Sequence, residues 1–214
     1  MELIEQMYSA GRVVGKTGKV FESVGALSTR NNLDTIEQLM RRTRPATTLE
    51  IGLAFGASAL TFADMHRKNG SPCSRQHVAI DPHESTVWDD VARLKLEESG
   101  LGEFVEVIEA PSCLALPQLL DQGRQFGLIY IDGSHLFENV FVDAFYCARL
   151  LAEDGYLLFD DSANRHVAKI IGFIDNDMPG VSRQPERTLR QSVARILGRR
   201  QLAIYRRIGP VERP

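Results

Sequence analysis

The chain has 214 residues, an apolar fraction of 43%, a charged fraction of 25% and a formal net charge of −3, which are ordinary values for a water-soluble protein. This length predicts one domain with a substantial hydrophobic core. Because the sequence has no run of about 18 uncharged apolar residues and no N-terminal signal-peptide pattern, we expect neither a membrane span nor a signal peptide.

Three cysteines occur, Cys73, Cys113 and Cys147, and no two of them form a CxxC pair. This spacing argues against a zinc site held by cysteines and against a disulfide framework. It suits a reducing compartment, so we expect a cytoplasmic protein.

Charge is distributed unevenly along the chain. The segment 181–214 carries nine arginines and two glutamates, whereas the first 180 residues carry 16 basic and 26 acidic side chains. A basic segment can bind nucleic acid or an acidic ligand. Here aromatic and basic residues interleave only at Tyr205–Arg207, so we favour a solvated helix face and do not expect a nucleic-acid partner.

Short apolar runs alternate with helical stretches along most of the chain. Residues 1–44 show largely helical spacing, with a break around Ser28–Asn32. Later apolar runs are too short and too rich in β-branched and aromatic residues to be helices. Candidate strands are 47–53, 77–82, 104–110, 126–132 and 156–161, and candidate helices between them are 57–69, 86–100, 112–122 and 136–152.

After the fifth strand, the pattern predicts helices at 165–176 and 187–197 and an antiparallel edge strand at 201–207. Strands that alternate with helices of this length are typical of βαβ units in a parallel sheet, whose strands are buried on both faces. The sequence therefore predicts one doubly wound α/β domain with a mostly parallel sheet. Its parts are an N-terminal helical extension (1–44), a core (45–161) and a C-terminal part that completes the sheet (162–214).

Acidic side chains stand at the ends of the predicted strands. Such groups are costly to bury unless they are paired, solvated or bound to a ligand. In an open parallel sheet, ligands bind beyond the carboxyl ends of the strands, so five such endings predict a binding site. The endings are Glu50 with Gly52, Asp81, Glu109 with Ala110, Asp132 with Gly133, Ser134 and His135, and Asp160 with Asp161.

The segment AGRVVGKT (10–17) resembles the phosphate-binding pattern GxxxxGK[ST], except that Ala10 occupies the first glycine position. That pattern binds phosphate when it joins a strand to a helix. Here the preceding residues Leu3, Ile4 and Met7 have helical spacing. We therefore expect a helical extension punctuated by glycines rather than a phosphate site.

The segment LEIGLAFGAS (49–58) does follow a strand and open a helix. Gly52 and Gly56 allow backbone to pass close to a ligand, although the spacing is not the GxGxxG of dinucleotide sites. Glu50 inside the strand suits an ammonium group better than a pyrophosphate. Asp81 ends the next strand, where it could accept hydrogen bonds from ribose hydroxyl groups.

Taken together, LEIGLAFGAS, AIDP, IEAPS, IYIDGSH and FDD resemble the class I S-adenosylmethionine-dependent methyltransferases over roughly residues 28–161. The resemblance is closest to the small metal-dependent O-methyltransferases, both the catechol type and the IDGxH sugar and natural-product branch. It implies a Rossmann-like fold, S-adenosylmethionine as cofactor and a small-molecule substrate.

The resemblance also implies a role for each matching position. Glu50 and the Gly52–Gly56 turn would hold the methionine end of the cofactor, and Asp81 would bind both ribose hydroxyl groups. Adenine would lie at 109–112, and Ser28 would lie in a segment over the cofactor carboxylate. The complete implied cofactor set is Ser28, Glu50, Gly52, Gly56, Ser58, Asp81, Glu109, Ala110, Ser112 and Asp132.

In metal-dependent members of the family, one acid after the fourth strand and two adjacent residues after the fifth hold a divalent ion. The matching residues are Asp132, Asp160 and Asp161, and carboxylates with water suit Mg²⁺. The catechol type has Asp-Asn at the last pair, whereas Asp-Asp agrees with the sugar-modifying branch. An alternative is that this segment only caps the following helix, which Asp, Ser and Asn do well.

His135 lies three residues beyond Asp132, where the catechol enzymes carry a lysine. A histidine can be neutral near pH 7 and accept a proton from a hydroxyl group, so we expect His135 to be the general base. The alternative is a structural hydrogen bond.

The function predicted from these residues is magnesium-assisted methylation of a hydroxyl group on a small molecule. A metal-independent enzyme that methylates nitrogen, or one that modifies RNA, stays open as an alternative. An NAD-linked or phosphate-binding protein is disfavoured by the glycine spacing. The apolar N-terminal extension could also pack against a second subunit, which would form a homo-oligomer.

Overall fold

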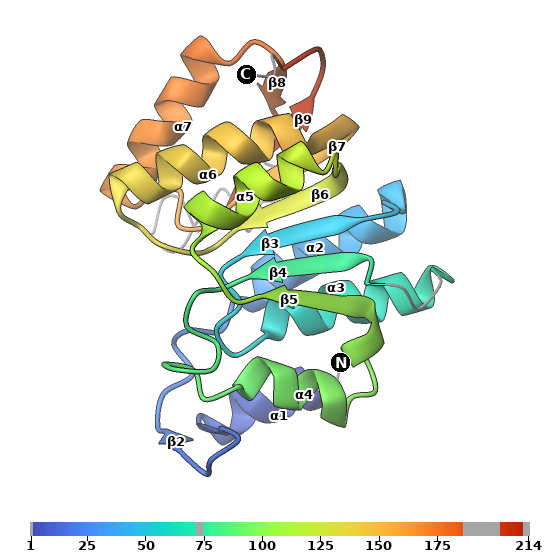
Figure 1. Cartoon of the computed structure of the whole chain (residues 1–214), viewed down its shortest axis with the longest axis vertical. Coiled ribbons are helices and arrows are strands. Elements are labelled where there is room, and N and C mark those ends of the chain that lie inside the picture. The colour runs from blue at the N-terminus through green and yellow to red at the C-terminus, as the bar shows by residue number, and fades with distance from the viewer. Residues whose placement is uncertain (1, 72–74, 186–201, 212–214) are drawn as a thin grey trace. The chain divides into compact units, whose positions relative to one another are not determined.

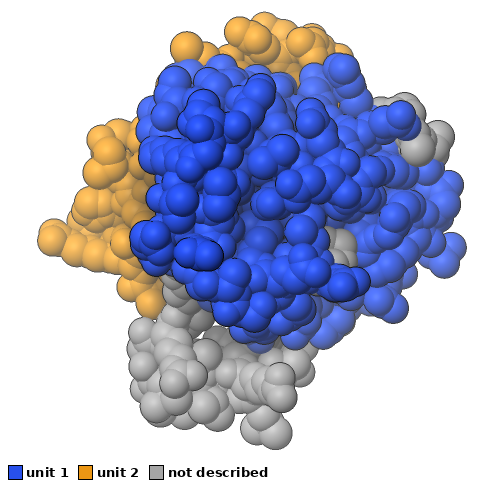
Figure 2. Space-filling model, turned by 90° about the horizontal axis from the view of Figure 1, so that it is seen from below, with its two compact units in different colours: residues 1–111 blue, residues 112–214 orange. Residues whose placement is uncertain are grey.

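The computed structural model describes residues 2–71, 75–185 and 202–211. The chain divides into two compact units, residues 1–111 (unit 1) and residues 112–214 (unit 2), which Figure 2 shows in blue and orange. Each unit contains parallel strands joined by helices, as predicted for an α/β protein.

Unit 1 contains three parallel strands in the order β5-β4-β3. Every residue of β3 and β4 is buried, because helices supply the crossovers between these strands. Figure 1 shows α2 and α3 behind the strands, and these two helices pack against each other. The elements are α2 (Arg30–Thr43), β3 (Thr48–Ile51), α3 (Ala57–Lys68), β4 (His77–Ile80), α4 (Val91–Glu98), the 3-10 helix η1 (Gly102–Phe104) and β5 (Val105–Ile108).

The sequence of helix α2 explains where the helix begins and which of its faces is buried. Thr29 precedes the helix in an extended conformation, and its hydroxyl oxygen accepts a hydrogen bond from the backbone N–H of Asn32. Leu33, Ile36 and Met40 are buried at helical spacing, so one face of α2 packs on the core of unit 1.

The N-terminal segment differs from the prediction of a mostly helical extension. The helix ends at Ala10, and the following residues form a small antiparallel hairpin whose turn is closed by a hydrogen bond from Gly15 N–H to the Lys19 carbonyl. Gly18 has φ +89°, which only glycine adopts at little cost. The expected helix through 10–17 is therefore wrong, and this segment is also not a strand–loop–helix phosphate site. The elements are α1 (Glu2–Ala10), β1 (Val13–Val14) and β2 (Val20–Phe21).

Helix α4 begins five residues later than the predicted start at residue 86. Residues 82–90 form turns instead, with the N–H of Trp88 donating to the His83 carbonyl at 3.1 Å. Asp89 and Asp90 both have left-handed backbone, with φ of 53° and 54°, so a right-handed helix can begin only after them.

The described residues of unit 2 form four strands in the order β6-β7-β9-β8. β6 and β7 are parallel, whereas β9 runs antiparallel to both β7 and β8. Figure 1 shows α5 and α6 side by side in front of β6 and β7. The elements are α5 (Ser112–Asp121), β6 (Phe126–Ile131), α6 (Phe137–Leu150), β7 (Leu151–Phe159), α7 (Arg165–Asp177), β8 (Val181–Arg183) and β9 (Ala203–Arg207).

Strand β7 begins at Leu151, five residues before the predicted start, directly after α6. Its register with β6 shifts between Phe126 and Leu128, so β7 contains an irregularity before its regular part. Asp154 has φ of 59° in this stretch, which breaks the alternation of a regular strand. The predicted strand 156–161 corresponds to the regular part only.

The predicted strand at 201–207 is present as β9 and is antiparallel, as expected. It is not an edge strand, because β8 pairs with its other side and was not predicted. The predicted helix 187–197 lies outside the described residues. Within the described part of the chain, no helix is long and apolar enough to cross a membrane.

Candidate functional site

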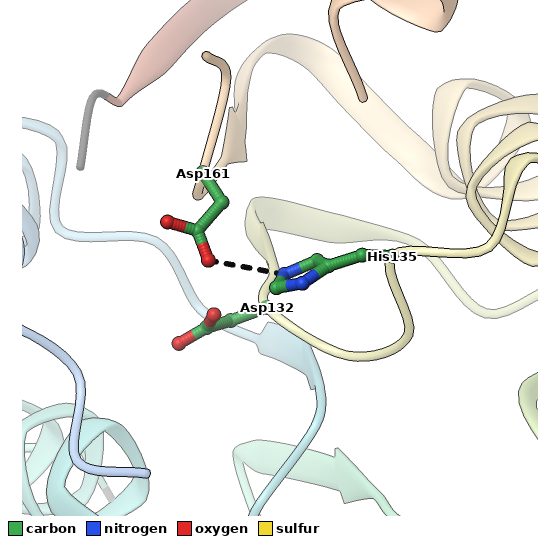
Figure 3. A group of neighbouring side chains, drawn as sticks. All are labelled: Asp132, His135 and Asp161. Carbon is green, nitrogen blue, oxygen red and sulfur yellow. Dashed lines mark ion pairs between the residues drawn. The ribbon is translucent and has the colours of Figure 1, made fainter. Parts of the chain in front are cut away.

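Three side chains meet beyond the carboxyl ends of β6 and β7 in unit 2: Asp132, His135 and Asp161, which we call the strand-end cluster (Figure 3). One potential ligand atom from each of them lies within 4.8 Å of the others. The three residues are partly exposed, so water can reach them. The structure thus brings together Asp132, His135 and Asp161, three of the site residues predicted from the sequence.

His135 and Asp161 are in direct contact. The distance from His135 Nε2 to Asp161 Oδ2 is 3.1 Å, and their side chains are 42% and 15% exposed. Asp161 has left-handed backbone with φ of 48°, and its carbonyl accepts the N–H of Asn164 at 2.7 Å. This tight turn directs Asp161 back towards the end of β6.

Asp160 was predicted to be a third metal ligand, but the structure does not bring it into the cluster. Its side chain is only 3% exposed. Asp160 Oδ1 accepts the backbone N–H of Asp161 at 2.7 Å, and Asp160 Oδ2 lies 3.2 Å from the Tyr130 hydroxyl group. Both oxygens therefore have partners inside unit 2.

Tyr130 links the two strand ends and was not identified from the sequence. Its hydroxyl group lies 2.9 Å from Asp132 Oδ2 as well as near Asp160, and it has one proton to donate. Tyr130 is fully buried in β6, two residues before Asp132 on the same face of the strand. That spacing is the signal that could have indicated it.

Helix α7 fixes the backbone around the cluster. Asn164 caps the helix by accepting the N–H of His166 at 2.9 Å. His166 Nδ1 in turn lies 3.1 Å from the His135 carbonyl oxygen. The capping role that the sequence left open for 160–164 thus belongs to Asn164.

In unit 1, Glu50 is a fully buried acid in β3. Burial raises its pKa to about 8, the nearby Asp81 charge adds to this effect, and the Ser58 hydroxyl group opposes it. His77 Nε2 lies 3.2 Å from Glu50 Oε1, but neither carboxyl oxygen has a hydrogen bond of normal geometry among the described residues. Glu50 is therefore a buried polar group that a ligand can satisfy.

The glycine turn between β3 and α3 has the backbone that its sequence predicts. Gly52 and Gly56 have φ of 93° and 80°, and Ala54 has φ of 45°. A Cβ atom at Gly56 would lie 2.7 Å from the Cβ atom of Ala92, so glycine is required there for packing against α4 as well. Ser58 lies buried in the first turn of α3.

Asp81 stands directly after β4 and holds this turn in place. Asp81 Oδ2 accepts the N–H groups of Leu53 and Ala54 at 3.0 and 3.1 Å, and Oδ1 accepts that of His83 at 2.8 Å. A carboxylate has about four acceptor positions, so one acceptor position on Oδ1 is left for another donor.

The remaining predicted cofactor residues have varied surroundings. Glu109 directly follows β5, and its pKa is lowered by hydrogen bonds from Ser85 and by the ion pair with Arg93 at 3.1 Å. Ser28 is buried before α2, and its carbonyl accepts the Tyr8 hydroxyl group. Ala110 follows Glu109 in unit 1, and Ser112 begins α5 in unit 2.

Comparison with known families gives one match. Residues 49–162, more than half of the chain, match a family model described as "Methyltransferase domain". This range contains every predicted site residue except Ser28. No curated protein sequence matches the chain.

Solved structures resemble the chain over almost its whole length. The cofactor-bound protein Rv0187 from MTB is 18% identical with a TM-score of 0.71, covering 98% of this chain and 89% of that one. An O-methyltransferase from Bacillus cereus in complex with SAH is 17% identical with a TM-score of 0.70, covering 97% and 89%. The SAH-bound methyltransferase PaMTH1 from Podospora anserina is 17% identical with a TM-score of 0.70, covering 97% and 86%.

These likenesses confirm the fold class, a doubly wound and mostly parallel α/β sheet of the Rossmann-like type. Each alignment extends through both units, so the predicted order of strands and helices along the chain is that of the known fold. At 17–18% identity the likenesses establish the fold and nothing finer.

Proposed function

Because the chain belongs to the methyltransferase domain family, we propose that it transfers a methyl group from S-adenosylmethionine to a hydroxyl oxygen of a small molecule, assisted by a divalent cation such as Mg²⁺. The observation that carries the metal-assisted form of this proposal is the strand-end cluster of two carboxylates and one imidazole. The bound cofactor supplies an activated methyl group, so the protein has to hold the acceptor oxygen in line and remove its proton.

Unit 1 is proposed to bind the cofactor. The buried carboxyl group of Glu50 lacks a satisfied partner, and a cofactor ammonium group would provide one. Asp81 keeps one acceptor position on Oδ1 for a ribose hydroxyl group while it fixes the glycine turn. The left-handed backbone at Gly52 and Gly56 allows close approach to the methionine end. Ser28, Ser58, Glu109 and Ala110 complete the cofactor set proposed in unit 1, and the family resemblance adds Ser112 and Asp132 of unit 2.

The strand-end cluster fits a hard divalent cation. Two ligands of one such ion lie about 3–5 Å apart, since each stands at roughly 2.0–2.6 Å from the metal. The cluster meets this limit with ligand atoms within 4.8 Å, and it is open enough for water to complete the shell. We propose Asp132 and Asp161 as ligands. Asp160, whose oxygens already have partners, is proposed to hold Tyr130 and the Asp161 backbone instead.

His135 is proposed to accept the proton of the substrate hydroxyl group. If neutral His135 donates its Nε2–H to Asp161 Oδ2, at the observed 3.1 Å, then Nδ1 is the free acceptor. Asp161 would thus orient the ring, and the proton would leave the substrate oxygen for Nδ1 as the methyl group arrives. The alternative role, metal binding through Nε2, would remove this orientation by Asp161.

The first test is binding to the whole protein, followed by differential scanning fluorimetry. S-Adenosylhomocysteine should raise the melting temperature, and MgCl2 should raise it further in its presence. The second test is turnover with methyl-labelled S-adenosylmethionine and a panel of catechols and hydroxyl-bearing sugars, with and without EDTA. Labelled methyl ethers that disappear with EDTA support the proposal, whereas full turnover in excess EDTA would refute the role of the metal.

A further inference from the structure

Three aromatic rings of unit 1 pack against one another at the glycine turn, and we call them the aromatic clamp: Phe21, Phe55 and Trp88. The ring centroids of Phe21 and Phe55 are 5.1 Å apart, and those of Phe55 and Trp88 are 5.2 Å apart, both edge to face. The centroids of Phe21 and Trp88 are 6.5 Å apart. Phe55 is only 2% exposed, so its neighbours enclose its ring.

Each ring of the aromatic clamp comes from a different segment of the chain. Phe55 lies in the glycine turn between β3 and α3, and Trp88 lies in the turns of residues 82–90, which follow Asp81. Phe21 is the last residue of β2 in the N-terminal hairpin. The clamp therefore connects the hairpin, which is outside the proposed cofactor site, to the glycine turn and to the segment after Asp81.

The glycine turn needs support from its surroundings. Ala54 has left-handed backbone with φ of 45°, which a residue other than glycine keeps only when neighbouring contacts hold it there. Asp81 Oδ2 supplies part of this support, because it accepts the N–H groups of Leu53 and Ala54. The next residue is Phe55, which the aromatic clamp encloses. Hydrogen bonds at 53 and 54 and ring packing at 55 thus hold three consecutive residues of the turn.

The N-terminal hairpin is fixed to the segment that carries Trp88. Asp89 Oδ2 accepts the N–H and the hydroxyl group of Thr17 at 3.0 and 2.9 Å, and the Asp89 carbonyl accepts the N–H of Lys16 at 2.8 Å. A Cβ atom on Gly15 would lie 2.6 Å from the Cβ atom of Asp89, so the hairpin can approach this closely only with glycine at that position. The second glycine of AGRVVGKT therefore serves the packing of the hairpin, which places the Phe21 ring against Phe55.

We propose that Phe21 is a positioning residue for the cofactor site: through Phe55, it holds the glycine turn in the backbone conformation that receives the methionine end of S-adenosylmethionine. The identity of this ligand rests on the proposed function, whereas the ordering of the turn by Phe21 does not. Without the Phe21 ring, the turn adopts its binding conformation for a smaller fraction of the time. The apparent affinity for the cofactor then falls in proportion to that fraction.

Amide hydrogen exchange of the free protein tests the ordering of the turn without any ligand. Phe21→Leu should speed the exchange of the Leu53 and Ala54 amides by roughly tenfold, because their hydrogen bonds to Asp81 open more often. Phe21→Tyr keeps the ring and should behave as the wild type. Phe104→Leu is the matched control, since Phe104 is a buried phenylalanine of the same core but lies in η1, and it should leave both amides unchanged. Unchanged exchange in Phe21→Leu, or equal acceleration in Phe21→Leu and Phe104→Leu, would overturn the proposal.

Calorimetric titration of S-adenosylhomocysteine tests the consequence for binding and separates the two proposals. Phe21→Leu should weaken binding by roughly tenfold, in step with the faster exchange. Because Phe21 acts through Phe55, adding Phe21→Leu to Phe55→Leu should cost no further affinity, and additive losses would overturn this route. Asp89→Ala leaves the backbone bond from Lys16 and the three rings in place, so it should weaken binding less than Phe21→Leu. If S-adenosylhomocysteine does not bind the wild type at all, the proposed function fails, while hydrogen exchange still decides whether Phe21 orders the turn.

Discussion

Glu50 in unit 1 and the strand-end cluster in unit 2 are both acidic sites at strand ends, but their surroundings are opposite. Glu50 is fully buried, faces a neutral histidine and has its pKa raised to about 8 by burial. In the strand-end cluster, the side chains of Asp161 and His135 are 15% and 42% exposed. In the sequence the two sites look alike, because each has an acidic residue at or near the end of a buried strand.

The difference indicates which ligand each site can take. A buried acid can pair with an organic cation such as an ammonium group if it ionises when the cation binds, because each buried charge then has a partner. Partly exposed carboxylates favour an ion such as Mg²⁺, which gives up its water reluctantly and is usually held by only one or two protein carboxylates. Substitutions at the two sites should therefore affect different steps of the reaction.

The largest effect should come from the metal ligands. Asp132→Asn or Asp161→Asn should abolish cation-dependent methyl transfer, because a bound cation contributes several kcal/mol to stabilising developing charge, which is ~10²-fold in rate or more. Turnover is measured with methyl-labelled cofactor, and metal affinity by titration of Mn²⁺ followed by EPR. Cofactor affinity should change little in Asp161→Asn, because Asp161 is not among the proposed cofactor residues.

Two other aspartates on β7 or at its end serve as controls for this prediction. Asp154→Asn, at an exposed position that pairs with Arg206, should leave turnover and metal affinity unchanged. Asp160→Asn should lower the melting temperature, because Asp160 holds Tyr130 and the Asp161 backbone. If Asp160→Asn abolishes Mn²⁺ binding in a folded protein while Asp161→Asn does not, the two adjacent residues have been assigned in the wrong order.

His135→Ala should have the next largest effect, lowering kcat by about 10²–10⁴ because a positioned base is lost. Mn²⁺ affinity decides between its two roles: it should stay close to that of the wild type for a base and fall for a metal ligand. His166→Ala is the matched control, since the His166 ring contacts the backbone carbonyl oxygen of His135 and not its imidazole, and the variant should leave kcat within a few fold. Wild-type kcat in His135→Ala would leave His135 a structural residue.

Asp81→Ala should weaken cofactor binding by about 1–3 kcal/mol, because ribose hydroxyl groups would lose a charged acceptor and the glycine turn would lose its support. Isothermal titration with S-adenosylhomocysteine measures this. Asp89→Ala is a fair control, since Asp89 is also a buried acid but anchors Thr17 of the N-terminal hairpin instead. Equal losses in both variants would show that the effect on binding is an indirect result of reduced stability.

Much of the fold could be predicted because its signals are local. Four of the five strand ends were located closely, since Asp81, Glu109, Asp132 and Asp160 each directly follow the last residue of a strand. The sequence did not predict the hairpin in 11–21 or the late start of α4. Both features depend on single residues with left-handed backbone. Asp90, with φ of 54°, carries no signal that distinguishes it from an ordinary helix cap.

The site could be predicted only in part, because partners far apart in sequence decide the role of each group. Asp160 and Asp161 are two adjacent acids in the sequence, yet Asp160 is hydrogen-bonded to the Tyr130 hydroxyl group, 30 residues away, whereas Asp161 contacts His135. Thr48 meets His66 and His77 at separations of 18 and 29 residues, and no spacing rule connects these three residues. Which partner each of these groups meets therefore emerged only from the three-dimensional structure.

The last prediction concerns how the free energy of unfolding depends on pH. Comparison of the wild type with Glu50→Gln separates the contribution of Glu50 from that of the other titrating groups. Its pKa is 4.5 in the unfolded chain and about 8 in the folded protein, so the folded state holds one more proton between these values. The free energy of unfolding should therefore fall as pH rises through this window. His66 and His77 act in the opposite direction, since burial lowers the pKa of each, but both proteins compared below contain them and their contribution cancels in the difference.

Between pH 6.5 and 8, the wild type should thus lose about 1.5–2 kcal/mol through Glu50 alone, at about 1.4 kcal/mol per pH unit and proton. Glu84 adds a smaller loss of the same sign, because burial raises its pKa to about 7. Urea unfolding of the wild type and of Glu50→Gln at both pH values gives the Glu50 contribution by difference, since Gln cannot ionise and Glu84 is common to both. The Gln variant should lose less than half as much stability as the wild type over this range. Equal losses in the two proteins would mean that Glu50 is already ionised when buried, so that binding a cation there would release no proton.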